Sequence, residues 1–474
     1  MKATVLRLLP LLFVLFLAAC TEGAAECPES NTVCSGQCTN LAVDRFNCGG
    51  CGIVCGGDFQ CIDGGCACLP GQTACEDTCT NLDNDVRNCG ACGNACAAGQ
   101  QCVDGACSEG CDGTLCAVGE EELCVDTETN ADHCGACGNA CPDGTSCLGG
   151  VCALGDLYAS CATEGSVVPL IKASNTIVSP RATGIDSPQA LALLGDSYVL
   201  AAGGLDNVLY VFDRATMGKV GEITVATVPN QILVRGQRAY VISSGENLVH
   251  VIDLTDPAAP KTADQVALGA GVNPMGGAFD ESGTLWISSW LSSRLHSVDF
   301  SGNLGVAGEP IELDTTGVEG TPYPTGVAVV GDTVYVSLNN LDENYQPAGN
   351  GRLATFERSS GERGMIDLGA TCTNPGFMAV RGTEIYVACT DSYVSGEVAV
   401  VDAESAQVVR RLATGGAPAR VALDEGRPGF VYVADAAGRG FFAIDESGEE
   451  ATIEKVDVCP EAAWEFNTDV LVVP

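Results

Sequence analysis

Residues 374–414 read NPGFMAVRGTEIYVACTDSYVSGEVAVVDAESAQVVRRLAT, and this stretch decides the fold. Its apolar runs, rich in β-branched residues, lie at 377–380, 385–388, 398–402 and 408–412, and turn-forming residues separate them. This pattern predicts four short β-strands with a turn after each. A single four-stranded sheet would leave both of its faces in water, so the unit needs neighbours of its own kind to pack against.

The same unit recurs along the second part of the chain. A proline precedes the first run of each copy, with steps of 41, 45, 50, 51, 43 and 42 residues, at Pro188, Pro229, Pro274, Pro324, Pro375, Pro418 and Pro460. An acidic residue closes the third run at Asp213, Asp253, Asp299, Glu357, Asp402 and Asp445. A period of about 40–50 residues with four strands in each unit is typical of a β-propeller.

The chain has seven of the repeated prolines but only six of the acidic residues, and this difference predicts how the propeller closes. The unit after Pro460 has room for two strands only, at 462–466 and 469–473. Two further strands, at 167–172 and 176–178, precede the first complete unit and supply the rest. We therefore expect an all-β fold, a seven-bladed propeller whose closing blade is shared by both ends of the domain and which small disulfide-rich modules precede. Closure leaves no free sheet edge between the blades.

Residues 156–474 resemble the YVTN-type propellers of the lactonase-like and surface-antigen-like group. The matching stretches are Thr333-Val334-Tyr335-Val336, Glu384-Ile385-Tyr386-Val387 and Gly429-Phe430-Val431-Tyr432-Val433, and each is followed by a third strand that ends in an acidic residue, as in Val400-Val401-Asp402. The resemblance implies the fold of the whole domain. It implies little about activity, because propellers carry many unrelated functions.

The first twenty residues form an export signal. Lys2 and Arg7 precede an apolar run at 8–17, and Leu17-Ala18-Ala19-Cys20 follows. This resembles a bacterial lipoprotein signal with its lipobox, which implies cleavage before Cys20 and acylation of that cysteine. An ordinary secretory signal is the alternative. In Gram-negative lipoproteins an Asp after the cysteine favours the inner membrane, so Thr21 points to the outer membrane or cell surface.

Three copies of an eight-cysteine pattern fill residues 21–155, at 27–66, 68–107 and 111–152, and they hold 24 of the 29 cysteines. An even number of cysteines in an exported segment favours four disulfides per copy, and eight cysteines allow 105 pairings. Zinc is the rival, because Cys48-x-x-Cys51 and its counterparts have ligand spacing. The Cys-Gly-x-Cys-Gly centre resembles the stigma-specific-protein-like module, which implies an extracellular spacer or interaction role.

Four cysteines remain once the modules and Cys20 are set aside. The start of a blade's first strand and the end of its second lie at the same end of a propeller, so Cys372 and Cys389 are expected to pair. Cys459 precedes the closing blade and Cys161 lies just before its N-terminal strands, so a bond between them would hold the ring shut. The alternative pairs Cys161 with a cysteine of the modules.

The charge limits the choice of partners. The chain carries a net charge of −39, and loss of Lys2 and Arg7 with the signal would bring it to −41. Such a surface repels phosphates, which argues against nucleic acid and against anionic lipid as partners. Membrane contact is expected only through the lipid anchor, and the expected partner is an envelope or extracellular protein or glycan.

The strand starts and the long loops supply the candidate ligand-binding residues. Polar or aromatic side chains lie beside the prolines, around the central opening, at Gln189, Asn230, Asn273, Tyr323, Asn374 and Arg420. The step from Asp299 to Glu357 is the longest, and much of its excess is an insertion at 339–351 that contains Tyr345. Trp290 lies in the equivalent loop of the preceding unit. Long loops on rigid scaffolds often bind ligands, and exposed aromatic residues are common anchors; turn formation alone is the alternative for the Asn and Pro residues.

Catalytic residues and metal ligands are not expected. The histidines are His133 in the modules and His250 and His296 on or beside third strands, away from the central opening. No nucleophile-elbow, zincin or phosphate-loop motif is present. We therefore expect a non-catalytic binding protein without a cofactor. The alternative is a lactonase-like hydrolase that uses the central channel, with amide ligands such as Asn230, Asn273 and Asn374 around a metal.

Overall fold

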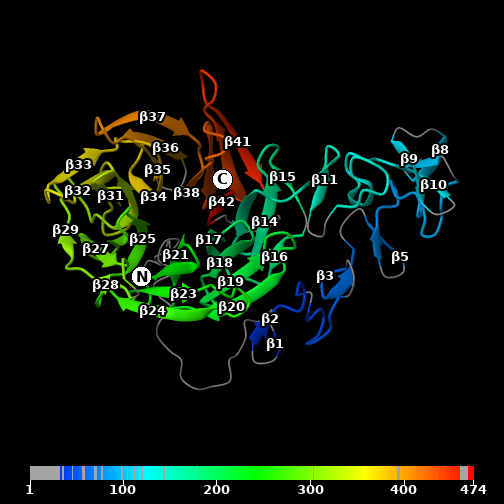
Figure 1. Ribbon diagram of the computed structural model, residues 1–474, viewed down its shortest axis with the longest axis horizontal. Coiled ribbons are helices and arrows are strands. Elements are labelled where there is room, and N and C mark those ends of the chain that lie inside the picture. The colour runs from blue at the N-terminus through cyan, green and yellow to red at the C-terminus, as the bar shows by residue number, and fades with distance from the viewer. Residues whose placement is uncertain are drawn as a thin grey trace, which may run out of the picture. The chain divides into compact units, whose positions relative to one another are not determined.

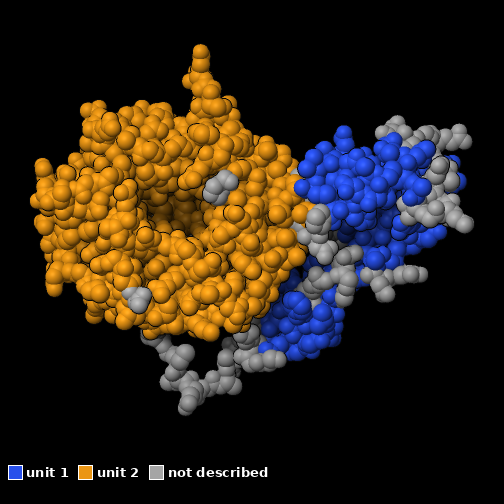
Figure 2. Space-filling model, viewed as in Figure 1, with its two compact units in different colours: residues 1–141, 147–152 blue, residues 142–146, 153–474 orange. Residues whose placement is uncertain are grey.

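The computed structural model describes residues 32–473 apart from 35–36, 45, 56–58, 69–71, 76–77, 98–99, 104, 110–112, 119–120, 142–144, 179, 303, 392–394 and 460–467. The chain divides into two compact units, one made of residues 1–141 and 147–152 and the other of 142–146 and 153–474 (Figure 2). Cys20 and the expected strand at 462–466 lie outside the described residues. In the part that is described, no helix has the length and apolar character to cross a membrane.

The second unit is a seven-bladed propeller (Figure 1). Six blades are complete antiparallel sheets whose strands follow chain order. The strands of the first three are β17 (Pro188–Leu194), β18 (Tyr198–Gly203), β19 (Val208–Asp213) and β20 (Lys219–Thr224); β21 (Pro229–Arg235), β22 (Arg238–Ser243), β23 (Leu248–Asp253) and β24 (Lys261–Ala267); and β25 (Pro274–Phe279), β26 (Thr284–Ser289), β27 (Arg294–Asp299), with β28 (Val306–Ala307) and β29 (Ile311–Glu312) both paired to β27.

The next three blades contain the stretch that opened the sequence analysis. Their strands are β30 (Pro324–Val330), β31 (Thr333–Leu338), β32 (Arg352–Glu357) and β33 (Arg363–Asp367); β34 (Asn374–Arg381), β35 (Glu384–Asp391), β36 (Ser395–Asp402) and β37 (Gln407–Ala413); and β38 (Pro418–Leu423), β39 (Phe430–Asp435), β40 (Gly440–Asp445) and β41 (Thr452–Asp457). The predicted four-stranded repeat is confirmed.

The repeated proline and the repeated acidic residue each have a physical cause. Five of the repeated prolines are the first residue of a blade's first strand, and Pro375 is the second residue of such a strand. The pairing register with the second strand shifts just after each of these six prolines, because proline has no N–H to donate to the neighbouring strand. The acidic residue ends the third strand in all six blades. In the five blades where this residue is Asp, its carboxylate accepts hydrogen bonds from the following turn, as Asp253 does from the backbone N–H of Thr255 at 2.9 Å.

The closing blade joins both ends of the domain, as predicted, but the N-terminal end supplies more strands than expected. Its sheet runs β15 (Thr176–Ile177), β14 (Ser166–Ile171), β13 (Leu157–Cys161) and β42 (Val470–Val472), and β16 (Ala182–Thr183) also pairs with β14. The additional strand is β13, which sequence reasoning placed outside the blade. It interrupts its apolar run with Ser160, but this serine is buried and its hydroxyl bonds the Thr468 hydroxyl at 2.7 Å.

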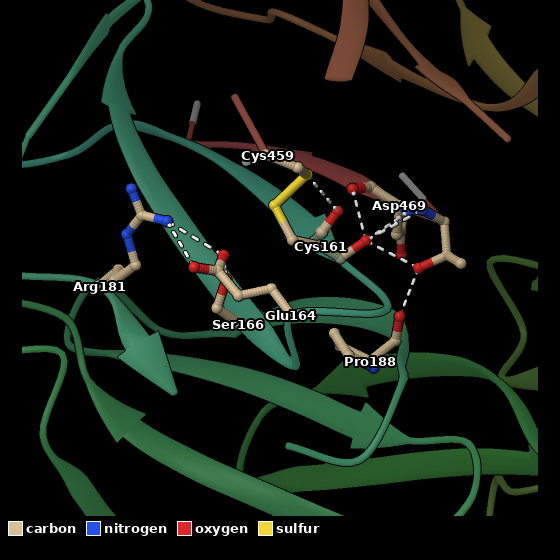
Figure 3. Close-up of a disulfide and its surroundings, with 9 residues drawn as sticks. Cys161, Glu164, Ser166, Arg181, Pro188, Cys459 and Asp469 are labelled. Carbon is tan, nitrogen blue, oxygen red and sulfur yellow. Dashed lines mark hydrogen bonds and ion pairs between the residues drawn. A yellow bond between two sulfur atoms is a disulfide. The ribbon is translucent and has the colours of Figure 1, made fainter. Parts of the chain in front are cut away.

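A disulfide links the two ends of this blade (Figure 3). Cys161 and Cys459 are bonded across 298 residues of sequence, with Cα atoms 5.6 Å apart. The Thr468 hydroxyl also donates a hydrogen bond to the carbonyl of Pro188 in the first strand of the next blade. The second expected bond, between Cys372 and Cys389, is present as well and spans 17 residues.

The core lies between neighbouring blades. One cluster, for example, packs Leu200 and Leu209 of the first complete blade against Val241 and Ile252 of the second. Each blade thus buries its faces on its neighbours, which is why the unit repeats.

The first unit consists of short hairpins tied by disulfides. The strands are β1 (Thr32–Cys34), β2 (Gln37–Thr39), β3 (Gln60–Ile62), β4 (Gly65–Ala67), β5 (Thr73–Cys75), β6 (Thr78–Thr80), β7 (Gln100–Val103), β8 (Ala106–Glu109), β9 (Thr114–Val118), β10 (Glu121–Val125), β11 (Ser146–Leu148) and β12 (Val151–Ala153), with a 3-10 turn η1 (Ala131–His133).

The middle module shows the full pairing. Its bonds are Cys68–Cys79, Cys75–Cys92, Cys89–Cys102 and Cys96–Cys107. The corresponding last three bonds recur in the first module and in the third. The two cysteines of each Cys-x-x-Cys pair belong to different disulfides, so this pairing uses the sulfur atoms that the zinc reading would need.

Candidate binding site

Three aromatic side chains from separate loops meet beside the third and fourth complete blades. Trp290 follows β26, Tyr323 precedes β30, and Tyr345 lies in the insertion between β31 and β32. The rings of Trp290 and Tyr323 have centroids 4.8 Å apart at an interplanar angle of 31°, and those of Tyr323 and Tyr345 lie 5.5 Å apart at 30°. All three are partly exposed. We call this group the aromatic stack; the sequence nominated all three of its members.

Hydrogen bonds hold the insertion that carries Tyr345 against the loop that carries Tyr323. The Asn340 side-chain oxygen accepts the backbone N–H groups of Glu319 at 3.1 Å and Gly320 at 2.7 Å. Leu341 forms isolated β-bridges with Thr321 and with Pro347. The insertion that carries Tyr345 is therefore braced by the loop that precedes β30.

The backbone at the stack is held in an unfavourable conformation. Tyr323 has φ of +36° and Tyr345 has φ of +58°, where bulky residues are rare. Such residues cost about 1–3 kcal/mol each and cluster at functional sites. Asn339, which is 2% exposed, supports Tyr323 by donating to its carbonyl at 2.9 Å and to the Thr325 hydroxyl at 2.9 Å.

The stack is neutral and apolar, with polar atoms at its edge. Burial first, and then the neighbouring Tyr345 hydroxyl, raise the pKa of Tyr323, so this phenol remains protonated at physiological pH. The Asn339 side-chain oxygen is buried and has no hydrogen-bond partner among the described residues. An unpaired buried acceptor is costly and commonly marks a functional site.

The three candidate asparagines, Asn230, Asn273 and Asn374, lie in different surroundings. The Asn230 side chain donates to the Pro274 carbonyl at 2.8 Å and thereby links two blades. Asn273 has φ of +50°, and its carbonyl accepts the backbone N–H of Trp290 at 3.0 Å, so it helps to position the backbone of one stack residue. Asn374 is the first residue of β34, where it pairs with Thr390. The structure therefore brings Asn273 to the stack and leaves Asn230 and Asn374 in the strand framework.

Arg420 in β38 contacts β21 in a blade that is not adjacent to its own. Its guanidinium lies 3.7 Å from the ring centroid of Phe377 and donates to the carbonyl of Asn230, which belongs to a blade that is not adjacent to its own. Glycine makes room on the facing strand: a Cβ on Gly276 would come within 3.1 Å of the Phe377 ring. Figure 2 shows the hollow at the centre of the propeller, and Arg420 and Phe377 reach across part of this opening.

The buried carboxylate of Asp469 lies next to Arg420. Asp469 lies 3.8 Å from the Arg420 guanidinium and accepts the backbone N–H of Leu191 at 2.8 Å. This separation is long for an ion pair, so burial outweighs the mutual attraction. Burial raises the pKa of Asp469 to about 6 and lowers the pKa of Arg420. Sequence reasoning missed Asp469, because a single Asp before a short terminal strand carries no local signal.

We expect Asp469→Asn to change how stability depends on pH. Between the ordinary carboxyl pKa of about 3.9 and the folded value of about 6, the folded chain holds a proton that the unfolded chain has released. Wild-type stability contributed by this group is therefore present below pH 4 and lost as pH rises to 6, by about 2 kcal/mol. The measurement is the difference in unfolding free energy between wild type and variant from pH 4 to 7; a difference that does not change with pH would contradict it.

The histidines are structural. His250 and His296 are buried in β23 and β27, and burial lowers the pKa of both, which keeps them neutral. The His250 ring accepts the backbone N–H of Ala226 at 3.2 Å. The hydrogen bonds described for these two side chains involve no residue of the aromatic stack and neither Arg420 nor Asp469.

Comparison with known proteins supports the fold alone. No protein-family model matches the chain, and no curated protein sequence matches it. Among solved structures, a provisionally assigned 6-phosphogluconolactonase from Bacteroides uniformis is 14% identical, with a TM-score of 0.52 over 67% of this chain and 98% of that one. A second, from Bacteroides fragilis, is 11% identical with a TM-score of 0.52 over 67% and 97%. A Lactobacillus plantarum protein is 12% identical with a TM-score of 0.51 over 67% and 100%.

Proposed function

We propose that this protein is a lipid-anchored component of a bacterial cell envelope that presents its propeller as a non-catalytic binding module. The aromatic stack carries the proposal: three aromatic side chains from three loops meet on a braced, strained backbone. Aromatic residues bury large areas at little cost in conformational entropy, which suits them as anchors for a partner. The partner class is an envelope or extracellular protein or glycan, because the acidic surface disfavours polyanions.

The remainder of the chain fits exposure outside the cytoplasm. Ten disulfides between described residues of the first unit and two in the propeller need an oxidising compartment to form. With Cys20 acylated, the modules at 27–66, 68–107 and 111–152 would act as a stalk of the stigma-specific-protein-like kind, and the outer membrane or cell surface would be the site of attachment.

The anchor is tested by the mass of the N-terminal peptide from native membranes. We expect the chain to begin at Cys20 with acyl chains attached, and Cys20→Ala to remove the protein from the membrane fraction. A chain that begins at another residue and is recovered in the soluble fraction would contradict the anchor and leave an ordinary secreted protein.

A hydrolase acting in the channel is the second candidate, and the buried Asp469 is the observation that favours it. A carboxyl group with a raised pKa near a channel is a possible general acid or base. Against this, Asp469 already accepts two backbone N–H groups, and the guanidinium of Arg420 lies 3.8 Å from its carboxylate. We expect no hydrolysis of sugar lactones by the purified chain, with or without added divalent metal. Hydrolysis that Asp469→Asn abolishes would favour this candidate.

A further inference from the structure

The first eight-cysteine module exposes a group of large apolar side chains at positions where its two sister modules carry polar or small residues. Four of its large apolar side chains are more than half exposed: Val43 at 64%, Phe46 at 62%, Ile53 at 54% and Val54 at 56%. We call these four residues the module-one patch. Soluble surfaces contain single exposed apolar residues, but a group within twelve residues of sequence suggests a contact surface.

The sister modules serve as internal controls. They share the central cysteine spacing, so equivalent positions can be read directly from the sequence. The equivalents of the patch in order are Asn84, Arg87, Asn94 and Ala95 in the second module and Thr129, Asp132, Asn139 and Ala140 in the third. The disulfide framework thus tolerates polar or small residues at all four positions, and the apolar residues are not needed to fold the module.

The backbone brings the two turns of the patch together. The backbone N–H of Cys48 donates to the carbonyl of Ile53 at 2.8 Å, and that of Gly52 donates to the Asn47 side chain at 2.8 Å. These bonds hold the turn that contains Phe46 beside the turn that contains Ile53. The hydrogen bonds that place these two turns side by side thus lie within the first module.

We propose that the module-one patch lies in the interfacial region of the lipid bilayer to which the chain is anchored, which adds a second membrane contact to the lipid anchor that the sequence alone led us to expect. This inference rests on the proposed acylation of Cys20. The first described strand begins only 12 residues after Cys20, a span of at most about 45 Å when fully extended. The module that lies closest to the anchor is thus the one with the apolar surface. A lipid anchor gains from a second weak membrane contact, since a tethered contact forms at a high effective concentration.

The test measures binding of the mature chain, exported without its lipid, to vesicles of zwitterionic phosphatidylcholine. The patch variant takes the residues of the second module, as Val43→Asn, Phe46→Arg, Ile53→Asn and Val54→Ala, so its disulfide framework should form. We expect its vesicle partition coefficient to be at least about tenfold lower than that of wild type, because four apolar side chains no longer leave water. The control is Val103→Asn, which replaces an exposed apolar residue of the second module and should leave partition unchanged.

Two outcomes would overturn the proposal. One is an equal vesicle partition coefficient for wild type and patch variant. In that case the absence of titratable thiols in both chains would show that their disulfides have formed and that both are folded. The other is a wild-type dimer in sedimentation velocity that the patch variant lacks, which would assign the patch to a second copy of the chain. Because the chain in this test carries no lipid, the result does not depend on acylation of Cys20, which the N-terminal mass tests separately.

Discussion

Removal of the Cys161–Cys459 disulfide, by Cys161→Ala with Cys459→Ala, is expected to destabilise the propeller by about 5 kcal/mol, because a cross-link over 298 residues strongly restricts the unfolded chain. In a domain of this size that corresponds to a fall in the melting temperature of roughly 8 °C. Loss of the disulfide also weakens the closing blade directly, because the C-terminal strand β42 is paired with β13 through three residues. The measurement is calorimetric unfolding of the full chain with the module disulfides intact.

The second disulfide of the propeller is the matched control. Cys372 and Cys389 are also fully buried, but their bond spans only 17 residues. Cys372→Ala with Cys389→Ala should therefore cost about 3 kcal/mol, or roughly 4 °C. Equal losses from the two pairs would show that joining the ends of the ring contributes no more than a local cross-link.

Loss of the aromatic stack is expected to abolish partner binding while leaving the propeller folded. Trp290→Ala and Tyr345→Ala should each weaken the partner's affinity by about 30-fold, which corresponds to a central anchor residue worth about 2 kcal/mol. Both side chains contact Tyr323, so the double variant should not show the simple sum of the two effects. The measurement is the dissociation constant of a purified partner, with the melting temperature as a check of folding.

The control for the stack is Leu205→Ala. Leu205 is 62% exposed and lies in the loop of the first complete blade that corresponds to Leu291, the residue after Trp290. The two loops have the same backbone bonds, from Leu205 to the Asp186 carbonyl and from Leu291 to the Val272 carbonyl. Equal weakening by Leu205→Ala would indicate a diffuse contact over this face and would contradict a site centred on the stack.

Local chemistry explains why so much of the fold could be predicted. The proline that starts a first strand and the acidic residue that ends a third strand each act on their own turn, so both are visible in the sequence and both mark the structure correctly. The closing blade was predicted less well. Strand β13 contains Ser160, a polar residue in a short run, and the partner that satisfies its hydroxyl is Thr468, which lies 308 residues away.

Some residues of the candidate site could likewise be predicted from the sequence, and others could not. Trp290 and Tyr345 were nominated by loop length and residue type, which the sequence contains. Asn339 and Asn340 were not nominated, because their roles depend on backbone groups in a neighbouring loop. Asp469 was not nominated either, because its importance comes from burial. Arg420 was nominated for its place beside Pro418, but its ion pair with Asp469 and its bond to the Asn230 carbonyl join strands that are distant in the chain and could not be predicted.

The most direct test of the binding function is cross-linking on intact native cells, followed by recovery of this protein and identification of what is attached to it. Wild type would be compared with the Trp290→Ala/Tyr345→Ala double variant, and with Leu205→Ala as the control. A binding function centred on the aromatic stack predicts a partner that wild type and the control capture and the double variant loses. Capture of the same partner by all three chains, or of no partner by a folded and surface-exposed wild type, would contradict it.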